Sequence, residues 1–267
     1  MLRRINIHLS FLFTIFSYFY VFAKTDIAII TNQEADTVDI IDLKKRIKIS
    51  EIQVGKKPAG IFVDKLNKIF FTSNPGTNNI SIYNLENQEH KFLKSGKSPM
   101  GIQLDSKKNF LFVSNWFENK VSVIDINKNE IVSEIEVGNS PAGIFLSDNE
   151  KLFVAIKEEN IITVIDTIKE TKIKNIRVGK APYGVFSDNK TNFLFVTNVQ
   201  SNTVTIIDKK SLKVIANIKV GSWPYQVAFE KRKKLLFVTN QRDNSISIID
   251  TKKFNVIKTL REVCEYP

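Results

Sequence analysis

Two identical stretches of sequence decide the fold: LFVTN at residues 194–198 and LFVTN at residues 236–240. Similar apolar runs that end in a polar turn occur four more times, as IAIITN at 27–32, IFFTSN at 69–74, LFVSN at 111–115 and LFVAI at 152–156. Successive copies lie 41 or 42 residues apart. A fixed period of this length is typical of propellers and solenoids, so about six repeats are predicted after residue 25.

Further residues recur in register with these runs. An Asp or Asn closes the following strand in each repeat: Asp42, Asn84, Asp125, Asp166, Asp208 and Asp250. A proline stands later in each repeat: Pro58, Pro99, Pro141, Pro182, Pro224 and, one residue late, Pro267. Each repeat therefore reads as four short strands separated by polar turns. Such sheets bury both faces only when they stack in a ring, which predicts an all-β fold, a β-propeller of six blades of four antiparallel strands with one incomplete blade.

The incomplete blade follows from a count of strands. Five prolines begin innermost strands and the other three strand types occur six times each, which predicts 23 strands. The first repeat lacks its inner strand, and Pro267 stands where that strand would begin. Three arrangements stay open: a six-bladed ring with one three-stranded blade, a truncated copy of a larger ring, or an open array that a partner completes. The first is favoured, although its unpaired inner edge is a liability.

Three motifs carry a family resemblance: FVTN at 195–198 and 237–240, TVTIID at 203–208, and Val-Gly-x-x-Pro before the inner strands. They resemble the YVTN-type β-propeller repeats of bacterial and archaeal secreted and surface-layer proteins. The resemblance covers the whole predicted mature chain. It implies an extracytoplasmic propeller, related in shape to WD-type repeats, but no particular ligand, because the motif consists of turn and packing residues.

The first 23 residues differ from the repeats. Arg3 and Arg4 precede a mostly apolar run from Ile5 to Phe22, and Ala23 offers a cleavage site. This pattern predicts a signal peptide at 1–23, a propeller domain at 24–267 and a periplasmic or secreted location. The alternative is a retained membrane anchor, since the run approaches the ~20 residues that span a bilayer. Contact with a membrane is expected only in that case.

The charge and cysteine content limit the classes of partner. The formal net charge is +11, but the lysines are scattered through every repeat, which is typical of a solubilised strand-rich surface. Nucleic acid is not expected as a partner, because the signal directs the chain away from it. The single cysteine, Cys264, excludes an intramolecular disulfide.

The search for catalytic motifs is negative. One histidine, His90, follows the predicted signal peptide, and it is expected as a solvated residue on an outermost strand. A lone His and a lone Cys far apart make neither an ordinary zinc site nor a Cys-His pair. No phosphate-binding loop or nucleophile elbow occurs. We therefore predict no catalytic residues, no metal site and no cofactor.

The informative residues are departures from the repeat. The Asn turns and the Val-Gly-x-x-Pro connections are expected on one rim of the ring, where a few repeats carry large aromatic residues. The predicted ligand- or partner-binding residues are Trp116, Phe117, Tyr183, Trp223, Tyr225 and Gln226. Exposed aromatic clusters are frequent binding anchors. The alternative is that these rings pack over the central channel or against neighbouring blades.

These observations predict a non-catalytic extracytoplasmic binding or scaffold protein that holds a protein or small-molecule ligand on one rim. One alternative is a propeller enzyme of the lactonase or hydrolase type, which needs acidic residues converging on the axis, and the inner-strand starts supply none. The other is a structural envelope component, a surface-array element whose open edge docks a neighbour.

Overall fold

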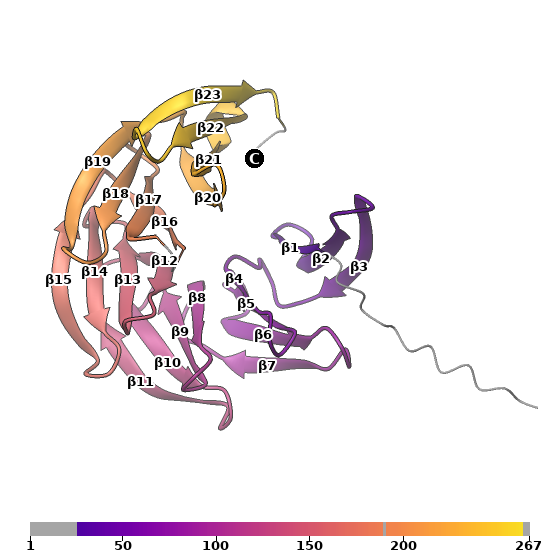
Figure 1. Cartoon of the computed structure of the whole chain (residues 1–267). Coiled ribbons are helices and arrows are strands. Elements are labelled where there is room, and N and C mark those ends of the chain that lie inside the picture. Colours follow the sequence, from indigo (N-terminus) through magenta and orange to yellow (C-terminus); the bar gives the residue numbers. More distant parts are fainter. Residues whose placement is uncertain (1–25, 189–190, 264–267) are drawn as a thin grey trace, which may run out of the picture.

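The blades follow one another in chain order around a common axis (Figure 1). This arrangement is seen in a computed structural model, which describes residues 26–188 and 191–263. The strands β4, β8, β12, β16 and β20 lie nearest the axis, and β7, β11, β15, β19 and β23 lie at the periphery.

The described residues form one three-stranded and five four-stranded antiparallel sheets. Blade 1 comprises β1 (Ile27–Asn32), β2 (Thr37–Asp42) and β3 (Ile47–Gln53). Blade 2 comprises β4 (Ile61–Asp64), β5 (Ile69–Asn74), β6 (Asn79–Asn84) and β7 (His90–Lys94). Blade 3 comprises β8 (Pro99–Asp105), β9 (Phe110–Asn115), β10 (Lys120–Asp125) and β11 (Glu130–Glu136). Blade 4 comprises β12 (Pro141–Leu146), β13 (Lys151–Ile156), β14 (Ile161–Asp166) and β15 (Thr171–Arg177). Blade 5 comprises β16 (Pro182–Ser187), β17 (Phe193–Asn198), β18 (Thr203–Asp208) and β19 (Lys213–Lys219). Blade 6 comprises β20 (Pro224–Glu230), β21 (Leu235–Asn240), β22 (Ser245–Asp250) and β23 (Asn255–Arg261). One short 3-10 helix, Gln241–Asp243, follows β21.

The core consists of apolar side chains between consecutive blades. The middle strands bury both faces, which explains why their sequences are almost continuously apolar rather than alternating. In blades 2 to 5 the phenylalanine of the repeat motif is at most 1% exposed: Phe71, Phe112, Phe153 and Phe195. Five apolar clusters join blades 1–2, 2–3, 3–4, 4–5 and 5–6, and none of these five joins blade 6 to blade 1 in the described residues. Blades 1 and 6 are the two ends of the arc in Figure 1.

The recurrent polar residues stabilise turns, as predicted. Asp42 Oδ1 accepts the N–H groups of Lys44 and Lys45 at 2.9 and 2.8 Å, and its counterparts in the other repeats bind their turns in the same way. The residues that open the next strand have left-handed backbone conformations: Asp36, Asn78, Asn119, Asn160, Asn202 and Asn244. Asn160 keeps this conformation although its repeat lacks the preceding Asn. The shared residues therefore serve the fold.

The predicted fold class is confirmed: a six-bladed β-propeller whose first blade has three strands and whose other blades have four. The 23 predicted strands are all present. No helix in residues 26–188 and 191–263 is long and apolar enough to cross a membrane. The predicted signal peptide, residues 1–23, lies outside the described residues.

Candidate functional site

The strand register places the predicted site residues on one rim. Three inner strands begin at a proline that pairs with the Asn closing the next strand: Pro99↔Asn115, Pro182↔Asn198 and Pro224↔Asn240. In blade 4 Pro141 pairs with Ile156, and in blade 2 the inner strand begins at Ile61, three residues after its proline. The residues that flank these pairs therefore surround one end of the axis. We call this end the aromatic rim.

Three of the predicted rings meet on the aromatic rim. The Tyr183 and Tyr225 ring centroids are 4.9 Å apart in an edge-to-face arrangement. The Trp116 centroid lies 6.3 Å from that of Tyr183. Trp116 follows β9 in blade 3, Tyr183 lies in β16 of blade 5, and Tyr225 lies in β20 of blade 6. Side chains of three different blades thus form one cluster, which we call the aromatic cluster.

The backbone that carries these rings is fixed by contacts between blades. The Thr197 hydroxyl accepts the N–H of Gly184 at 2.8 Å and donates to the carbonyl of Tyr225 at 2.8 Å. The same contact recurs from Ser73 to Met100 O and from Ser114 to Ala142 O. Tyr225 is therefore held by a contact that three blades share. Before Tyr183 the hydroxyl position is occupied by Ala155, and the carbonyl of Tyr183 instead packs closely against Gly143.

A cation and two neutral phenols give the cluster its polarity. The Lys157 ammonium lies 5.0 Å from the Trp116 ring centroid, a cation–π distance. Burial, with a smaller effect from Tyr225, raises the pKa of Tyr183 to about 12. Burial also raises the pKa of Tyr225. Both phenols keep their protons at neutral pH, so they offer hydrogen-bond donors rather than bases or nucleophiles.

The other three predicted residues lie outside this cluster. Phe117 is 73% exposed beside Trp116, and Trp223 is 41% exposed with the Arg242 guanidinium 5.4 Å from its ring. Gln226 is exposed, and a Cβ added to Gly184 would lie 3.5 Å from its Oε1. The alternative prediction, that these rings pack against neighbouring blades, holds for two of them: Trp116 and Tyr183 pack against the apolar cluster of blades 4 and 5. Phe117 and Trp223 are not part of that cluster.

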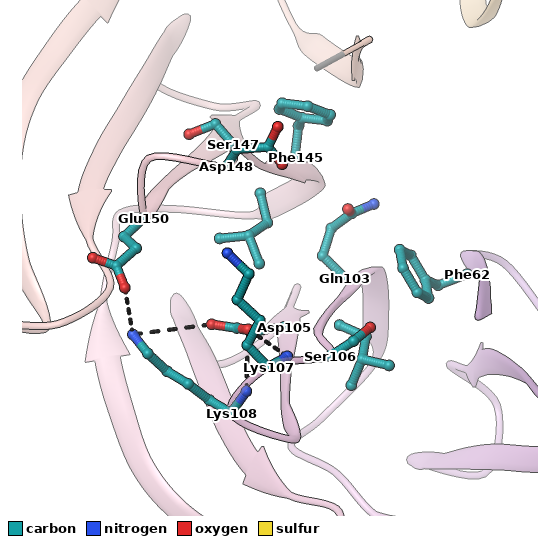
Figure 2. A pocket seen from close by; sticks show the side chains of 12 residues that line it. Phe62, Gln103, Asp105, Ser106, Lys107, Lys108, Phe145, Ser147, Asp148 and Glu150 are labelled. Atoms are coloured by element: carbon teal, nitrogen blue, oxygen red, sulfur yellow. Dashed lines mark hydrogen bonds and ion pairs between the residues drawn. The ribbon is translucent and has the colours of Figure 1, made fainter. Parts of the chain in front are cut away.

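Sequence reasoning missed a pocket at the opposite end of the axis. It has a volume of about 380 Å³ and is lined from blades 2, 3 and 4, with Gln103 between Phe62 and Phe145 in Figure 2. At its wall, Lys108 pairs with Glu150 at 2.9 Å. Gln103 stands where blades 2, 4 and 5 have Phe62, Phe145 and Phe186, so an amide replaces a ring there. That departure from the repeat was the available signal.

A buried lysine lies beside this pocket. Lys209 is 9% exposed, and its Nζ lies 5.3 Å from the Phe145 ring centroid and donates to the carbonyl of Asp188 at 3.4 Å. Burial lowers the pKa of Lys209, while Asp148 and Asp188 oppose this shift. Lys231 pairs with the Asp188 carboxylate at 2.8 Å. The charges around Lys209 are therefore compensated within the protein.

His90 differs from its prediction. It lies on an outermost strand, β7, as expected, but it is partly buried rather than solvated. Its ring lies 5.8 Å from that of Tyr83 and 4.5 Å from that of Phe92, and its Nε2 has no hydrogen-bond partner within residues 26–188 and 191–263. The described residues contain no group of three or more His, Cys, Asp or Glu side chains placed to hold a metal ion.

A family model described as a YNCE-like β-propeller matches residues 13–193, more than half of the chain. A search of curated proteins finds no match. The predicted kind of family, a propeller-repeat family, is thereby confirmed, and the finer assignment to the YVTN type stays a prediction.

Several solved structures are similar in fold. Hydrazine synthase of Kuenenia stuttgartiensis matches with a TM-score of 0.74 and 19% identity, over 85% of this chain and 74% of that one. A functionally unknown protein from Desulfotomaculum acetoxidans matches with a TM-score of 0.76 and 11% identity, over 88% and 80%. Dihydro-heme d1 dehydrogenase NirN, solved in complex with DHE, matches with a TM-score of 0.65 and 14% identity, over 88% and 55%. At these identities the likeness shows the fold alone.

Proposed function

The chain belongs to the YNCE-like β-propeller family, and on that fold we propose a non-catalytic binding module that holds a protein or small-molecule ligand on the aromatic rim. One observation carries the proposal: Trp116, Tyr183 and Tyr225 come from three blades and still form one cluster. At the Tyr183 and Tyr225 position, the other repeats have Ala59, Met100 and Ala142. The repeat does not require these rings, so they are free to serve binding.

The cluster has the character of a binding anchor. Aromatic rings provide a large contact area at low entropic cost, and their polar atoms orient a ligand. Here the exposed rings of Phe117 and Trp223 flank the cluster, and Lys157 adds a cation. The ligand chemistry that fits is an apolar or planar group with a hydrogen-bond acceptor.

The polar chemistry favours binding over catalysis. The raised pKa values of Tyr183 and Tyr225 oppose a role for either phenol as a base. The carboxylates at the far ends of the inner strands are engaged in turns: Asp64 Oδ1 accepts two backbone N–H groups, and so does Asp105 Oδ1. The enzyme and surface-array alternatives are separated from this proposal by hydrolase assays and by the oligomeric state.

We also propose that the protein acts outside the cytoplasm after removal of residues 1–23, and that its repeats are of the YVTN type. The apolar run before Ala23 supports the first proposal, and the contacts made by the FVTN motif support the second. Val196 is fully buried, the Thr197 hydroxyl contacts the next blade, and Asn198 donates to the Thr205 hydroxyl at 2.8 Å. The intact mass of protein recovered from the envelope fraction tests the cleavage, and a mass that includes residues 1–23 in pelleted membranes would favour the anchor.

The rim proposal is tested by capture from envelope extract. Trp116→Ala and Trp223→Ala are compared with wild type and with Lys65→Ala, a change to an exposed residue in the β4–β5 turn of the opposite rim. Loss of a true anchor is expected to weaken binding by about 2 kcal/mol or more. Thermal unfolding shows whether each variant is folded. If Lys65→Ala loses the same partners as fully as the tryptophan variants, the rim is the wrong face.

A further inference from the structure

One inner strand, β8, lacks the aromatic ring that three of its counterparts provide. Phe62 packs against the apolar cluster of blades 2 and 3, Phe145 belongs to that of blades 4 and 5, and Phe186 packs against that of blades 5 and 6. Each ring thus fills space beside the following blade. Blade 3 has Gln103 at this position, and Gln103 is not part of the cluster of blades 3 and 4. The pocket of Figure 2 lies here, with Gln103 in its lining.

The Gln103 amide is available to a ligand. Gln103 is only partly buried, and its side chain makes no hydrogen bond to any residue in the ranges 26–188 and 191–263. A side-chain amide offers two donors and an acceptor. Because the protein uses none of them, all three can bind a polar group in the pocket.

Two phenylalanine rings flank this amide. Figure 2 shows the Gln103 side chain between those of Phe62 and Phe145. Aromatic rings favour stacked or edge-to-face contacts with other rings. The pocket volume of about 380 Å³ falls at the small end of ligand pockets, which span roughly 300–1,000 Å³. A small planar ligand fits this space.

The carboxylates that line the pocket are already engaged. Glu150 Oε1 accepts from Lys108 Nζ at 2.9 Å, and Asp105 Oδ1 accepts two backbone N–H groups of the β8–β9 turn at 3.0 and 3.2 Å. The charge of Asp148 acts on the buried Lys209, where it opposes the lowering of the lysine pKa by burial. These acidic groups are therefore compensated within the protein.

Lys107 is a lining cation without such compensation. Its ammonium makes no ion pair or hydrogen bond with the part of the chain that the structure describes. The residue is exposed, and in Figure 2 its side chain extends from the β8–β9 turn toward Ser147 and Asp148 of blade 4. A negatively charged group at the pocket mouth can therefore pair with Lys107.

We propose that this pocket binds a small planar anion of the aromatic carboxylate class. The ligand ring lies against Phe62 and Phe145, the Gln103 amide hydrogen-bonds its polar edge, and Lys107 pairs with its carboxylate. The site is independent of the aromatic rim, because it lies at the other end of the axis and shares no lining residue with the aromatic cluster.

The test titrates the full chain with three probes that share one ring system: a naphthoate, the neutral naphthamide and the cationic naphthylmethylammonium ion. Calorimetry is expected to show the tightest binding for the naphthoate. Lys107→Gln is expected to weaken naphthoate binding about fivefold, a small effect because the ammonium is exposed, and to leave naphthamide binding unchanged. Lys44→Gln, at an exposed lysine in the β2–β3 turn outside the pocket, is the matched control and is expected to change neither.

Gln103→Phe tests the location. This change gives blade 3 the ring that blades 2, 4 and 5 already have, so the variant is expected to keep the wild-type melting temperature. It also removes the amide and fills the pocket, so naphthoate affinity is expected to fall at least about tenfold. Trp116→Ala, on the aromatic rim, is expected to bind naphthoate as wild type does. Lys107 is exposed, so its variant keeps the test decisive even if Gln103→Phe fails to fold.

Four results would overturn the inference. The first is no naphthoate binding by the wild-type chain. The second is unchanged naphthoate binding by a folded Gln103→Phe variant. The third is a naphthylmethylammonium ion that binds as tightly as the naphthoate. The fourth is loss of naphthoate binding in Trp116→Ala alone, which would place the probe on the aromatic rim.

Discussion

Phe195 and Phe237 occupy the same position in consecutive repeats but differ in burial. Phe195 is 0% exposed between blades 5 and 6, whereas Phe237 faces away from blade 5 and is partly exposed. Phe195→Ala is expected to lower the free energy of unfolding by about 3–5 kcal/mol, and Phe237→Ala by less than half of that. Urea unfolding measures both. An equal loss of unfolding free energy in both variants would mean that Phe237 is also covered by neighbouring residues, which would contradict this prediction.

His90 makes stability depend on pH. Burial lowers its pKa below the 6.5 of a free histidine. Between these two values the unfolded state binds more protons than the folded state, so stability falls as the pH falls below 6.5. His90→Phe is expected to flatten the dependence of the melting temperature on pH between 5 and 7 and to leave its slope above pH 7.5 unchanged. A variant with the wild-type slope between pH 5 and 7 would contradict this.

At the residue scale, the sequence reveals departures from the repeat but not what each departure does. The rings at Trp116, Tyr183 and Tyr225 could be predicted to share a rim, because their positions in the repeat are known. Their mutual contact depends on the tilt of the strands around the axis, which no sequence pattern encodes. Gln103 was missed because its effect, a pocket, arises from the loss of a ring between two blades.

At the scale of elements, the inner strands are spaced so closely that glycine is required. A Cβ at Gly143 would meet the backbone carbonyl of Tyr183, which cannot move without its strand. Gly143→Gln is therefore expected to destabilise the protein strongly, while Gln226→Gly, at the same position of the last blade, is expected to be nearly neutral. Thermal unfolding of the two variants tests this. A similar loss in both would mean that Gln226 contributes to the fold.

The same comparison suggests why a glutamine is tolerated at position 226, which the sequence alone does not explain. It could be predicted as an exception among glycines near the axis. That β20 has no inner strand following it among the described residues became visible only with the blades placed in space. An exception to a repeat can therefore mark a position where a packing requirement ends, as well as a binding residue.

At the scale of the whole molecule, the repeat predicted nearly everything about the fold. Period, strand order and blade number follow from residues such as Asn198 and Pro182, because their counterparts have the same local role in most blades. The relation of blade 1 to blade 6 could not be predicted in this way, since it depends on contacts that occur once. Sequence periodicity therefore cannot predict the contacts at the two ends of a repeat array.

The most direct test of the proposal that a partner binds on the aromatic rim is photocrosslinking from two exposed turn positions. A benzoyl-phenylalanine is placed at Phe117, beside the aromatic cluster and 73% exposed, or at Leu66, in the opposite rim and 90% exposed. Both proteins are irradiated in envelope extract, and adducts are identified by mass. A binding site on the aromatic rim predicts a discrete adduct from position 117 that Trp223→Ala diminishes, and none from position 66. The same adduct from position 66, or none from position 117, would contradict the account.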